Sequence, residues 1–189
     1  MTTSQTPDPA ADRARLLDLI LARAIVLGRV TLSSGAEADF YVDLRRISLD
    51  GEAAPLVGRV LRELTRDLDY GAVGGLTLGA DPVATSMLHA AAAAGQRLDA
   101  FVVRKEGKAH GLQQRIEGPS IAGRRVLVVE DTTTTGASPL TAVQAAREAG
   151  AEVVAVVTIA DRATGAGEKI EAQGVPYRFA FSVRELGLG

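Results

Sequence analysis

Apolar residues near the start of the chain recur with the period of an amphipathic helix. The i, i+3, i+4 spacing runs from Asp12 to Leu27 and again from Leu56 to Leu68, behind a candidate cap at Asp50. Both segments are predicted to be helices with one buried face. Between them, residues 28–47 combine a Ser-Ser-Gly turn signal with a short apolar run, which indicates a turn and short strands. We expect this segment to form a small hood over a main sheet.

From Gly71 onwards, near-continuous apolar runs alternate with helical ones. The apolar runs, which predict strands, are Ala72 to Leu76, Asp99 to Val103, Arg125 to Val129, Val153 to Ile159 and Tyr177 to Phe181. The helices predicted between them are about Pro82 to Ala94, Gly136 to Ala149 and Gly165 to Gln173. This alternation predicts an α/β fold with a parallel sheet and helices on both faces. Ligands of such sheets bind at the carboxyl ends of the strands.

The length of 189 residues fits one globular domain, and no repeat or linker divides the chain. We expect residues 1–10, rich in Thr, Ser and Pro, to form a flexible tail and residues 11–189 to form the domain. The apolar stretch Leu16 to Leu27 is interrupted by Asp18 and Arg23, and no Lys or Arg precedes Arg13. It therefore predicts neither a membrane span nor a secretory signal, and we expect a cytoplasmic protein.

Charge and composition restrict the chemistry. A formal net charge of -2 gives no overall attraction to nucleic acid or to an anionic membrane, so any anion site must be local. The absence of cysteine excludes disulfides, thiolate metal sites and a cysteine nucleophile. Two histidines are too few for a histidine-built metal centre.

The run Val126 to Gly136, VLVVEDTTTTG, combines acceptors and donors in one place. Glu130 and Asp131 directly follow the predicted strand, and a threonine-rich loop leads from them into a helix. Threonine hydroxyls and the NH groups of a helix start suit a phosphate, while the carboxylates suit ribose hydroxyls or the water around Mg²⁺. The run therefore predicts a sugar-phosphate site.

This run resembles the 5-phosphoribosyl diphosphate (PRPP) signature of the type I phosphoribosyltransferases. The resemblance implies that Glu130 and Asp131 hold the ribose 2- and 3-hydroxyls, with Asp131 close to the chemistry, and that the loop holds the 5-phosphate. The loop residues implied in PRPP binding are Thr132, Thr133, Thr134, Thr135, Gly136, Ala137 and Ser138. A strand ending in acids could also belong to a P-loop ATPase, but the chain has no G-x-x-x-x-G-K-[ST] pattern, which excludes that reading.

A basic segment follows the predicted strand that ends at Val103. Four potential donors to a diphosphate lie within seven residues, namely Arg104, Lys105, Lys108 and His110. Only Leu112 is large and apolar between Lys105 and Gln114, so we expect a loop of about residues 105–117 to be mobile when empty.

The R-K-x-x-K-x-H spacing resembles the catalytic loop of the orotate phosphoribosyltransferases. In that family the loop closes over the diphosphate, partly from the neighbouring subunit of a dimer. The resemblance therefore implies PRPP contacts from all four donors, a catalytic acid that is either Lys108 or His110, and a homodimer that shares loop 105–117. It covers the chain from about Gly28 to Arg162.

The resemblance also implies a base site. Arg162 follows a predicted strand, and its planar fork can pair with the carboxylate of orotate through two hydrogen bonds. Phe40, Tyr41 and Thr134 are the other implied orotate contacts. Ser33 and Gly79 stand where members of the family carry lysine, so more of the diphosphate binding is left to the loop.

The implied reaction is orotate plus PRPP giving orotidine 5-monophosphate and diphosphate, a step of pyrimidine (UMP) synthesis. Mg²⁺ is the implied cofactor, held mainly by PRPP and water near Glu130 and Asp131 with no direct protein ligand. Two alternatives stay open, a phosphoribosyltransferase for a purine base and a non-catalytic regulator that senses PRPP. Arg162 disfavours the first, and the intact basic loop disfavours the second.

Overall fold

The first helix begins earlier and ends earlier than its pattern predicts. The structure, a computed structural model, describes residues 8–31, 37–105 and 115–188. Helix α1 spans Pro9–Arg23, and Asp8 caps it by accepting a hydrogen bond from the backbone NH of Ala10 at 3.0 Å. Pro9 and Ala10 are therefore not part of a tail, and the rest of the predicted tail, residues 1–7, lies outside the described residues. The predicted end at Leu27 was wrong because the chain pairs as a strand from Ile25.

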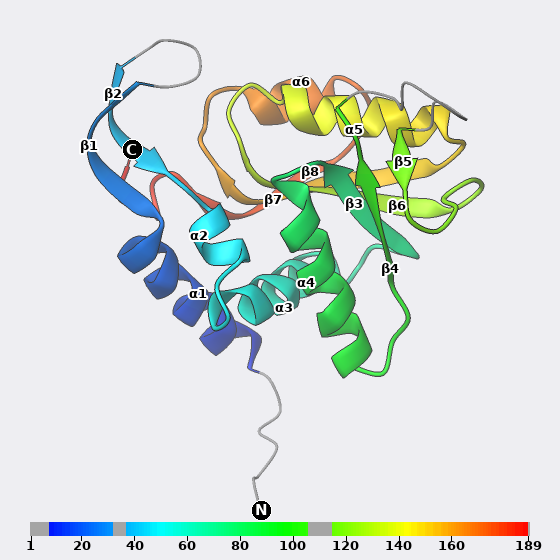
Figure 1. The fold of residues 1–189 in the computed structure, drawn as a ribbon, viewed down its shortest axis with the longest axis horizontal. Helices are drawn as coiled ribbons and strands as arrows, with labels where there is room; N and C mark the ends of the chain where they lie inside the picture. Colours follow the sequence, from blue (N-terminus) through cyan, green and yellow to red (C-terminus); the bar gives the residue numbers. More distant parts are fainter. Residues whose placement is uncertain (1–7, 32–36, 106–114, 189) are drawn as a thin grey trace, which may run out of the picture.

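The hood is a two-stranded antiparallel sheet followed by a short helix. Its elements are β1 (Ile25–Thr31), β2 (Glu37–Val42) and α2 (Arg45–Ser48). In Figure 1 the two strands project at the upper left, away from the main sheet. The predicted short strands are confirmed, whereas the predicted turn at residues 33–35 lies outside the described residues. Helix α2 was not predicted, because four residues are too few to show a helical period.

The main sheet has six strands in the order β5-β4-β3-β6-β7-β8. They are β3 (Ala72–Leu76), β4 (Asp99–Val103), β5 (Ile116–Glu117), β6 (Arg125–Thr133), β7 (Glu152–Asp161) and β8 (Tyr177–Ser182). All neighbours are parallel except the edge strand β5, which pairs antiparallel with β4 through Val103 and Ile116. The predicted parallel sheet is confirmed. The predicted loop 105–117 ends too late, because Ile116 and Glu117 gain backbone partners at the edge of β4.

Helices cover both faces of the sheet. The remaining helices are α3 (Ala53–Leu64), α4 (Ala80–Ala93), α5 (Ala137–Glu148) and α6 (Ala166–Glu171). Successive residues of β6 point to opposite faces. Leu127 and Val129 accordingly join the core beneath α1, α3 and α4, whereas Val126 and Val128 join the core beneath α5 and α6. No helix in the described part of the chain is long and apolar enough to cross a membrane.

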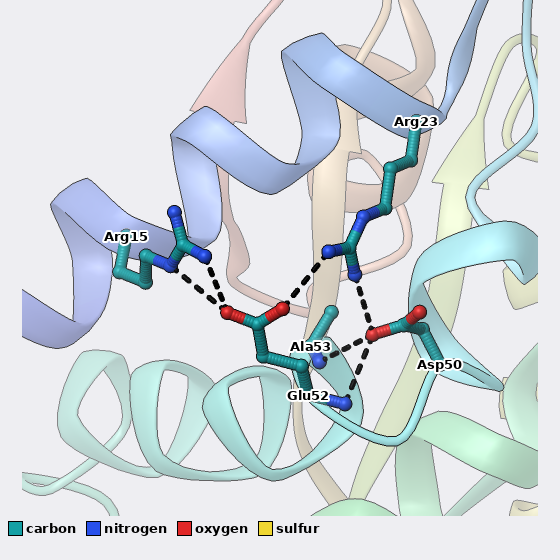
Figure 2. Close-up of polar contacts among 5 residues, drawn as sticks. All are labelled: Arg15, Arg23, Asp50, Glu52 and Ala53. Carbon is teal, nitrogen blue, oxygen red and sulfur yellow. Dashed lines mark hydrogen bonds and ion pairs between the residues drawn. The ribbon is translucent and has the colours of Figure 1, made fainter.

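A polar network joins α1 to the start of α3 (Figure 2). Asp50 Oδ1 accepts hydrogen bonds from the backbone NH groups of Glu52 and Ala53, both at 2.9 Å. Asp50 therefore bonds to the start of α3 as predicted, although Glu52 and not Asp50 occupies the N-cap position. Arg23 donates to Asp50 at 2.8 Å and to Glu52 at 2.9 Å, and Arg15 donates to Glu52 at 3.1 Å. The network holds the helix that precedes the hood against the helix that follows it.

Candidate functional site

The acidic pair lies inside β6 rather than after it. β6 continues to Thr133, with Glu130 opposite Thr158 and Thr132 opposite Ala160 of β7. The prediction that the strand ends at Val129 was wrong because β7 supplies parallel backbone partners beyond the apolar run. Only 5% of Glu130 is exposed, so this acid lies on the floor of the site.

The turn after β3 packs directly on the acidic pair. A Cβ on Gly79 would lie 2.3 Å from Glu130 Oε1 and 3.0 Å from Asp131 Oδ1. No side chain fits there unless the carboxylates move. The backbone at Gly79 thus lies directly against Glu130 and Asp131, so a lysine side chain at this position would overlap with their carboxylates.

Burial raises the pKa of both acids. The pKa of Glu130 rises from 4.5 to about 8, first because burial removes water from the carboxylate and then because Asp131 is beside it. Burial likewise raises the pKa of Asp131. The backbone NH of Asp131 donates to Glu130 Oε1 at 3.1 Å, and the NH of Thr132 donates to Asp131 Oδ1 at 2.6 Å. Hydroxyl groups of a ligand would donate further hydrogen bonds to Glu130 and Asp131, which burial shields from solvent.

Asp81 is a third acid at the site, which sequence reasoning missed. It is among the charges that raise the pKa of Glu130, and its Oδ2 accepts a hydrogen bond from Thr77 Oγ1 at 2.7 Å. Asp81 Oδ1 and Thr132 Oγ1 are buried, with no hydrogen-bond partner in the part of the chain that the structure describes. Buried polar atoms without partners are uncommon and often mark functional sites. The signal available beforehand was an acid in the first turn of a helix that follows a strand.

The threonine loop is shaped by its own hydroxyls. Thr133 is 4% exposed, and its Oγ1 accepts a hydrogen bond from the NH of Gly136 at 3.1 Å. Thr135 Oγ1 accepts one from the NH of Ala137 at 3.4 Å. Gly136 has φ 79° and precedes α5. The loop therefore turns tightly into the helix, and its exposed residues are Thr134, Thr135, Ala137 and Ser138.

The hood brings an arginine to the acids. Arg45 donates to Asp43 Oδ1 at 2.9 Å and to the hydroxyl oxygen of Tyr41 at 3.3 Å. Its charge also lowers the pKa of Asp131, although less than burial raises it. The sequence interpretation named Tyr41 but missed Arg45, which no strand-end pattern marks. The side chain of Phe40 lies outside the described residues.

Arg162 follows β7 at the carboxyl edge of the sheet, as predicted, and this edge also carries the threonine loop of residues 132–138, which we call the cradle. Asp161 ends β7 opposite Thr133 of β6, so the residue after it is at the same edge of the sheet as the threonine loop. Arg162 is half-buried. Thr164 Oγ1 donates a hydrogen bond to the carbonyl oxygen of Thr134, which ties the two segments together.

The basic segment is described only at its ends. Arg104 and Lys105 are exposed, and the NH of Arg104 donates to the carbonyl oxygen of Arg115 at 2.8 Å. The Arg104 guanidinium lies 3.5 Å from Glu117 Oε1. The catalytic candidates Lys108 and His110 lie in residues 106–114, outside the described residues. Both described ends of the segment meet at the β4–β5 edge.

No group of three acidic or histidine side chains within residues 8–31, 37–105 and 115–188 is placed to hold a metal ion. Asp81, Glu130 and Asp131 nevertheless supply the hard oxygen atoms that suit a hydrated Mg²⁺. The arrangement as a whole can bind an anion in the loop, hydroxyl groups at the acids and a carboxylate at Arg162.

The chain is similar to known proteins over most of its length. A family model described as "Phosphoribosyl transferase domain" matches residues 47–176. The orotate phosphoribosyltransferase of Streptomyces avermitilis is 75% identical over 177 residues, which cover 93% of this chain and 97% of that protein. The corresponding protein of Corynebacterium glutamicum is 61% identical over 179 residues, which cover 95% and 96%. The crystal structure of Mycobacterium tuberculosis orotate phosphoribosyltransferase in complex with PRPP is 55% identical, with a TM-score of 0.82 and coverage of 94% of this chain and 99% of that one.

Proposed function

This chain belongs to the orotate phosphoribosyltransferases within the phosphoribosyltransferase family, and from that premise we propose how its residues divide the reaction. The reaction transfers the 5-phosphoribosyl group of PRPP to orotate and releases diphosphate. The observation that carries the assignment of roles is the register of β6 and β7, because it places the threonine loop and Arg162 at one edge. In the cell we propose that the enzyme works in the cytoplasm, in de novo pyrimidine synthesis, and that the chain from helix α1 onwards forms its single domain.

The ribose is proposed to bind at the acidic pair. Glu130 and Asp131 would accept hydrogen bonds from its 2- and 3-hydroxyls, which replaces the water that burial has removed. The 5-phosphate would lie in the loop from Thr132 to Ser138, where the exposed residues Thr134, Thr135 and Ser138 offer hydroxyl and backbone donors. In this arrangement the anomeric carbon faces the remaining substrate.

Orotate is proposed to bind between Arg162 and the hood. Arg162 would pair with the carboxylate of the base through its planar fork, and Thr134, Phe40 and Tyr41 would complete the pocket. Arg45 lies beside Tyr41 and adds a second cation at the hood side. An uncharged purine would give Arg162 no carboxylate to pair with.

Charge separation decides which groups act in the chemical step. As the bond to diphosphate lengthens, the ribose becomes positive and the leaving group negative. Asp131, beside the ribose, would stabilise the former, while Arg104, Lys105, Lys108 and His110 would stabilise the latter. Lys108 or His110 would give a proton to the departing oxygen. No covalent intermediate with the enzyme is required.

Mg²⁺ is the proposed cofactor. It would be held mainly by PRPP and water, with Asp81, Glu130 and Asp131 as oxygen acceptors for the bound water. When bound, it supplies charge neutralisation of the diphosphate. Asp81 Oδ1 is buried and has no hydrogen-bond partner among the described residues, which supports a water-bearing cation near this carboxylate.

A homodimer is proposed on the basis of an exposed groove. The groove has a volume of about 1520 Å³ and is flanked by Leu49 and Leu78, which are 69% and 61% exposed. Both signs of charge line it, from Asp12, Glu63, Asp81, Arg59, Arg62 and Arg97. A two-fold interface needs such a self-complementary surface. Leu78 adjoins Gly79, which lies on the acids, so a second copy bound here is proposed to lend its basic loop, which ends before Ile116, to this site.

The direct test of the proposed function is loss of orotate absorbance on addition of PRPP and Mg²⁺, with adenine, hypoxanthine and uracil as control bases. Consumption of orotate alone supports the assignment. Consumption of a purine in preference to orotate would contradict it.

A further inference from the structure

The turn that carries Arg162 is held in an unusual backbone conformation. We define the Arg162 turn as residues 161–165. Ala163 has φ 54°, in the left-handed region that residues other than glycine rarely adopt. Asp161 Oδ2 accepts a hydrogen bond from the NH of Ala163 at 3.2 Å, which supports this conformation. Such a backbone persists where surrounding contacts determine it.

Tyr177 of β8 anchors this turn from the sheet. Its hydroxyl donates to Asp161 Oδ1 at 3.1 Å and lies 3.0 Å from Thr158 Oγ1. Thr158 is fully buried, so this hydrogen-bonded chain starts in the core. Oδ1 of Asp161 is therefore held by the Tyr177 hydroxyl, while Oδ2 holds the backbone of the turn through the NH of Ala163.

Thr164 anchors the same turn to the phosphate cradle. Its hydroxyl donates to the carbonyl oxygen of Thr134, a residue of the loop proposed to bind the 5-phosphate. Thr134 is exposed, so a ligand can reach its loop. The Arg162 turn is thus fixed on one side by the core and on the other by a segment that a ligand can order.

We propose that Thr164 and Tyr177 are positioning residues that couple the two substrate sites. A phosphate in the cradle fixes the position of the Thr134 carbonyl. Because the Thr164 hydroxyl is bonded to this carbonyl, the Arg162 turn is fixed as well, with Arg162 placed to contact the base. Tyr177 keeps the turn in register with the sheet. The inference rests on the proposed roles of the cradle and of Arg162. Since coupling is reciprocal, orotate also strengthens binding of the sugar phosphate.

The first experiment measures orotate affinity calorimetrically with and without saturating ribose 5-phosphate. This probe carries the phosphate and hydroxyls but no leaving group, so no reaction occurs. The ratio of the two affinities in the wild type should be at least about 5-fold. Thr164→Val removes the hydroxyl at nearly constant volume, and the ratio should fall to about 1-fold while orotate affinity without the sugar phosphate stays close to wild type.

Two variants control for general effects of the substitution. Thr164→Ser keeps the hydroxyl and should restore the ratio. Thr65→Val removes a hydroxyl that donates to the carbonyl oxygen of Leu61 at 2.8 Å, outside both proposed substrate sites, and should keep the wild-type ratio.

The second experiment tests Tyr177 by steady-state kinetics. Tyr177→Phe should raise the orotate KM several-fold while the PRPP KM and kcat stay close to wild type, because the turn loosens but the cradle does not. The matched control is Tyr70→Phe, which removes a hydroxyl that lies 2.7 Å from Thr65 Oγ1, outside the proposed site. A structural effect alone would lower the Tm of both variants without raising the orotate KM of either.

The outcomes separate failure of the coupling through Thr164 from failure of the proposed roles of the cradle and Arg162. A wild-type ratio near 1, or a Thr164→Val ratio equal to that of the wild type, overturns the coupling. Failure of ribose 5-phosphate to bind overturns the cradle assignment and the coupling with it. If Arg162→Lys leaves orotate affinity unchanged, the proposed base site is wrong, whereas an effect of Arg162→Lys without an effect of Thr164→Val leaves the proposed function intact and removes only the coupling.

Discussion

Glu130 illustrates how a single residue of the proposed site can reduce the stability of the fold. The residue is 5% exposed, and the pKa of its carboxyl group is raised from 4.5 to about 8 by burial and by Asp131. In the unfolded chain the group returns to an ordinary pKa. At a pH between these two pKa values, the folded protein keeps a proton on Glu130 that the unfolded chain releases. The free energy of unfolding is therefore unaffected by this group below its unfolded pKa, and it falls as the pH rises through about 8.

Glu130→Gln should remove this pH dependence. Glutamine cannot ionise and still offers an oxygen to the NH of Asp131. We expect the Tm of the variant to be close to that of the wild type at about pH 5 and several degrees higher at about pH 9, with PRPP binding weakened. Thermal unfolding across this range measures it, and Glu171→Gln on the exposed side of α6 is the control. Parallel Tm curves for wild type and Glu130→Gln would contradict the raised pKa.

Arg162→Lys keeps the charge at the proposed base site but loses the two-pronged pairing. One charge-assisted hydrogen bond should disappear, which corresponds to an orotate KM about 10-fold higher with the PRPP KM nearly unchanged. Arg147→Lys, an exposed arginine whose partner is the carbonyl oxygen of Gln173, is the control and should behave as wild type. An unchanged orotate KM would place the carboxylate contact elsewhere.

At the scale of elements, the site depends on how closely α3 and α4 cross. Asp81 lies in the first turn of α4. Gly79, the residue before α4, packs on Glu130 and Asp131. A Cβ on Gly58 of α3 would lie 2.2 Å from the backbone oxygen of Ser86 on α4. The two helices therefore approach to a distance that only glycine allows, and the position of α4 in turn determines where its first turn meets the acids.

Gly58→Ala sets two effects against each other. Alanine favours a helix over glycine by about 1 kcal/mol. The overlap with the Ser86 carbonyl should cost more, so we expect a net loss of about 1 to 3 kcal/mol in the free energy of unfolding. Urea denaturation measures it, with Gly51→Ala as the control because a Cβ there meets nothing within 4 Å. A gain in stability would mean that the helix crossing adjusts freely.

At the scale of the whole molecule, the exposed groove predicts a dimer. Leu78→Glu combined with Leu49→Glu places two charges in the apolar part of the groove, so we expect a monomer with little activity. Sedimentation equilibrium measures the mass. The control is Leu21→Glu, since Leu21 is 42% exposed but does not line the groove. A double variant that remains dimeric would place the interface on another surface.

Sharing of the loop between subunits predicts complementation. Lys108→Ala and Arg162→Ala should each be nearly inactive, but a mixed dimer would contain one site with both groups intact and one with neither. Random exchange at equal amounts makes about half of the dimers mixed, so activity should recover to about a quarter of the wild type. Mass spectrometry confirms exchange. Exchanged mixtures that stay as inactive as their parents would mean that each loop serves its own chain.

Local patterns were sufficient to predict most of the elements of the domain and to single out the acid-threonine run as a candidate site. The apolar runs predicted β3 and β4 to the residue, and the acid-threonine run was located at a strand end before its partners were known. Such features depend on spacing within about ten residues, because the periods of strand and helix determine which side chains face the core. Residues without a local period, such as Arg45 and the two-residue strand β5, could not be found in this way.

The sequence by itself thus determined the fold class, the order of the main strands and helices, and the segment proposed to bind an anion. Only the tertiary structure decided that β6 continues through the acids, that Gly79 lies on Glu130, and that Thr164 bonds to the Thr134 carbonyl. Each of these depends on two segments that are distant along the chain. The raised pKa of Glu130 has the same origin, since burial is a property of the packed molecule and not of the residue.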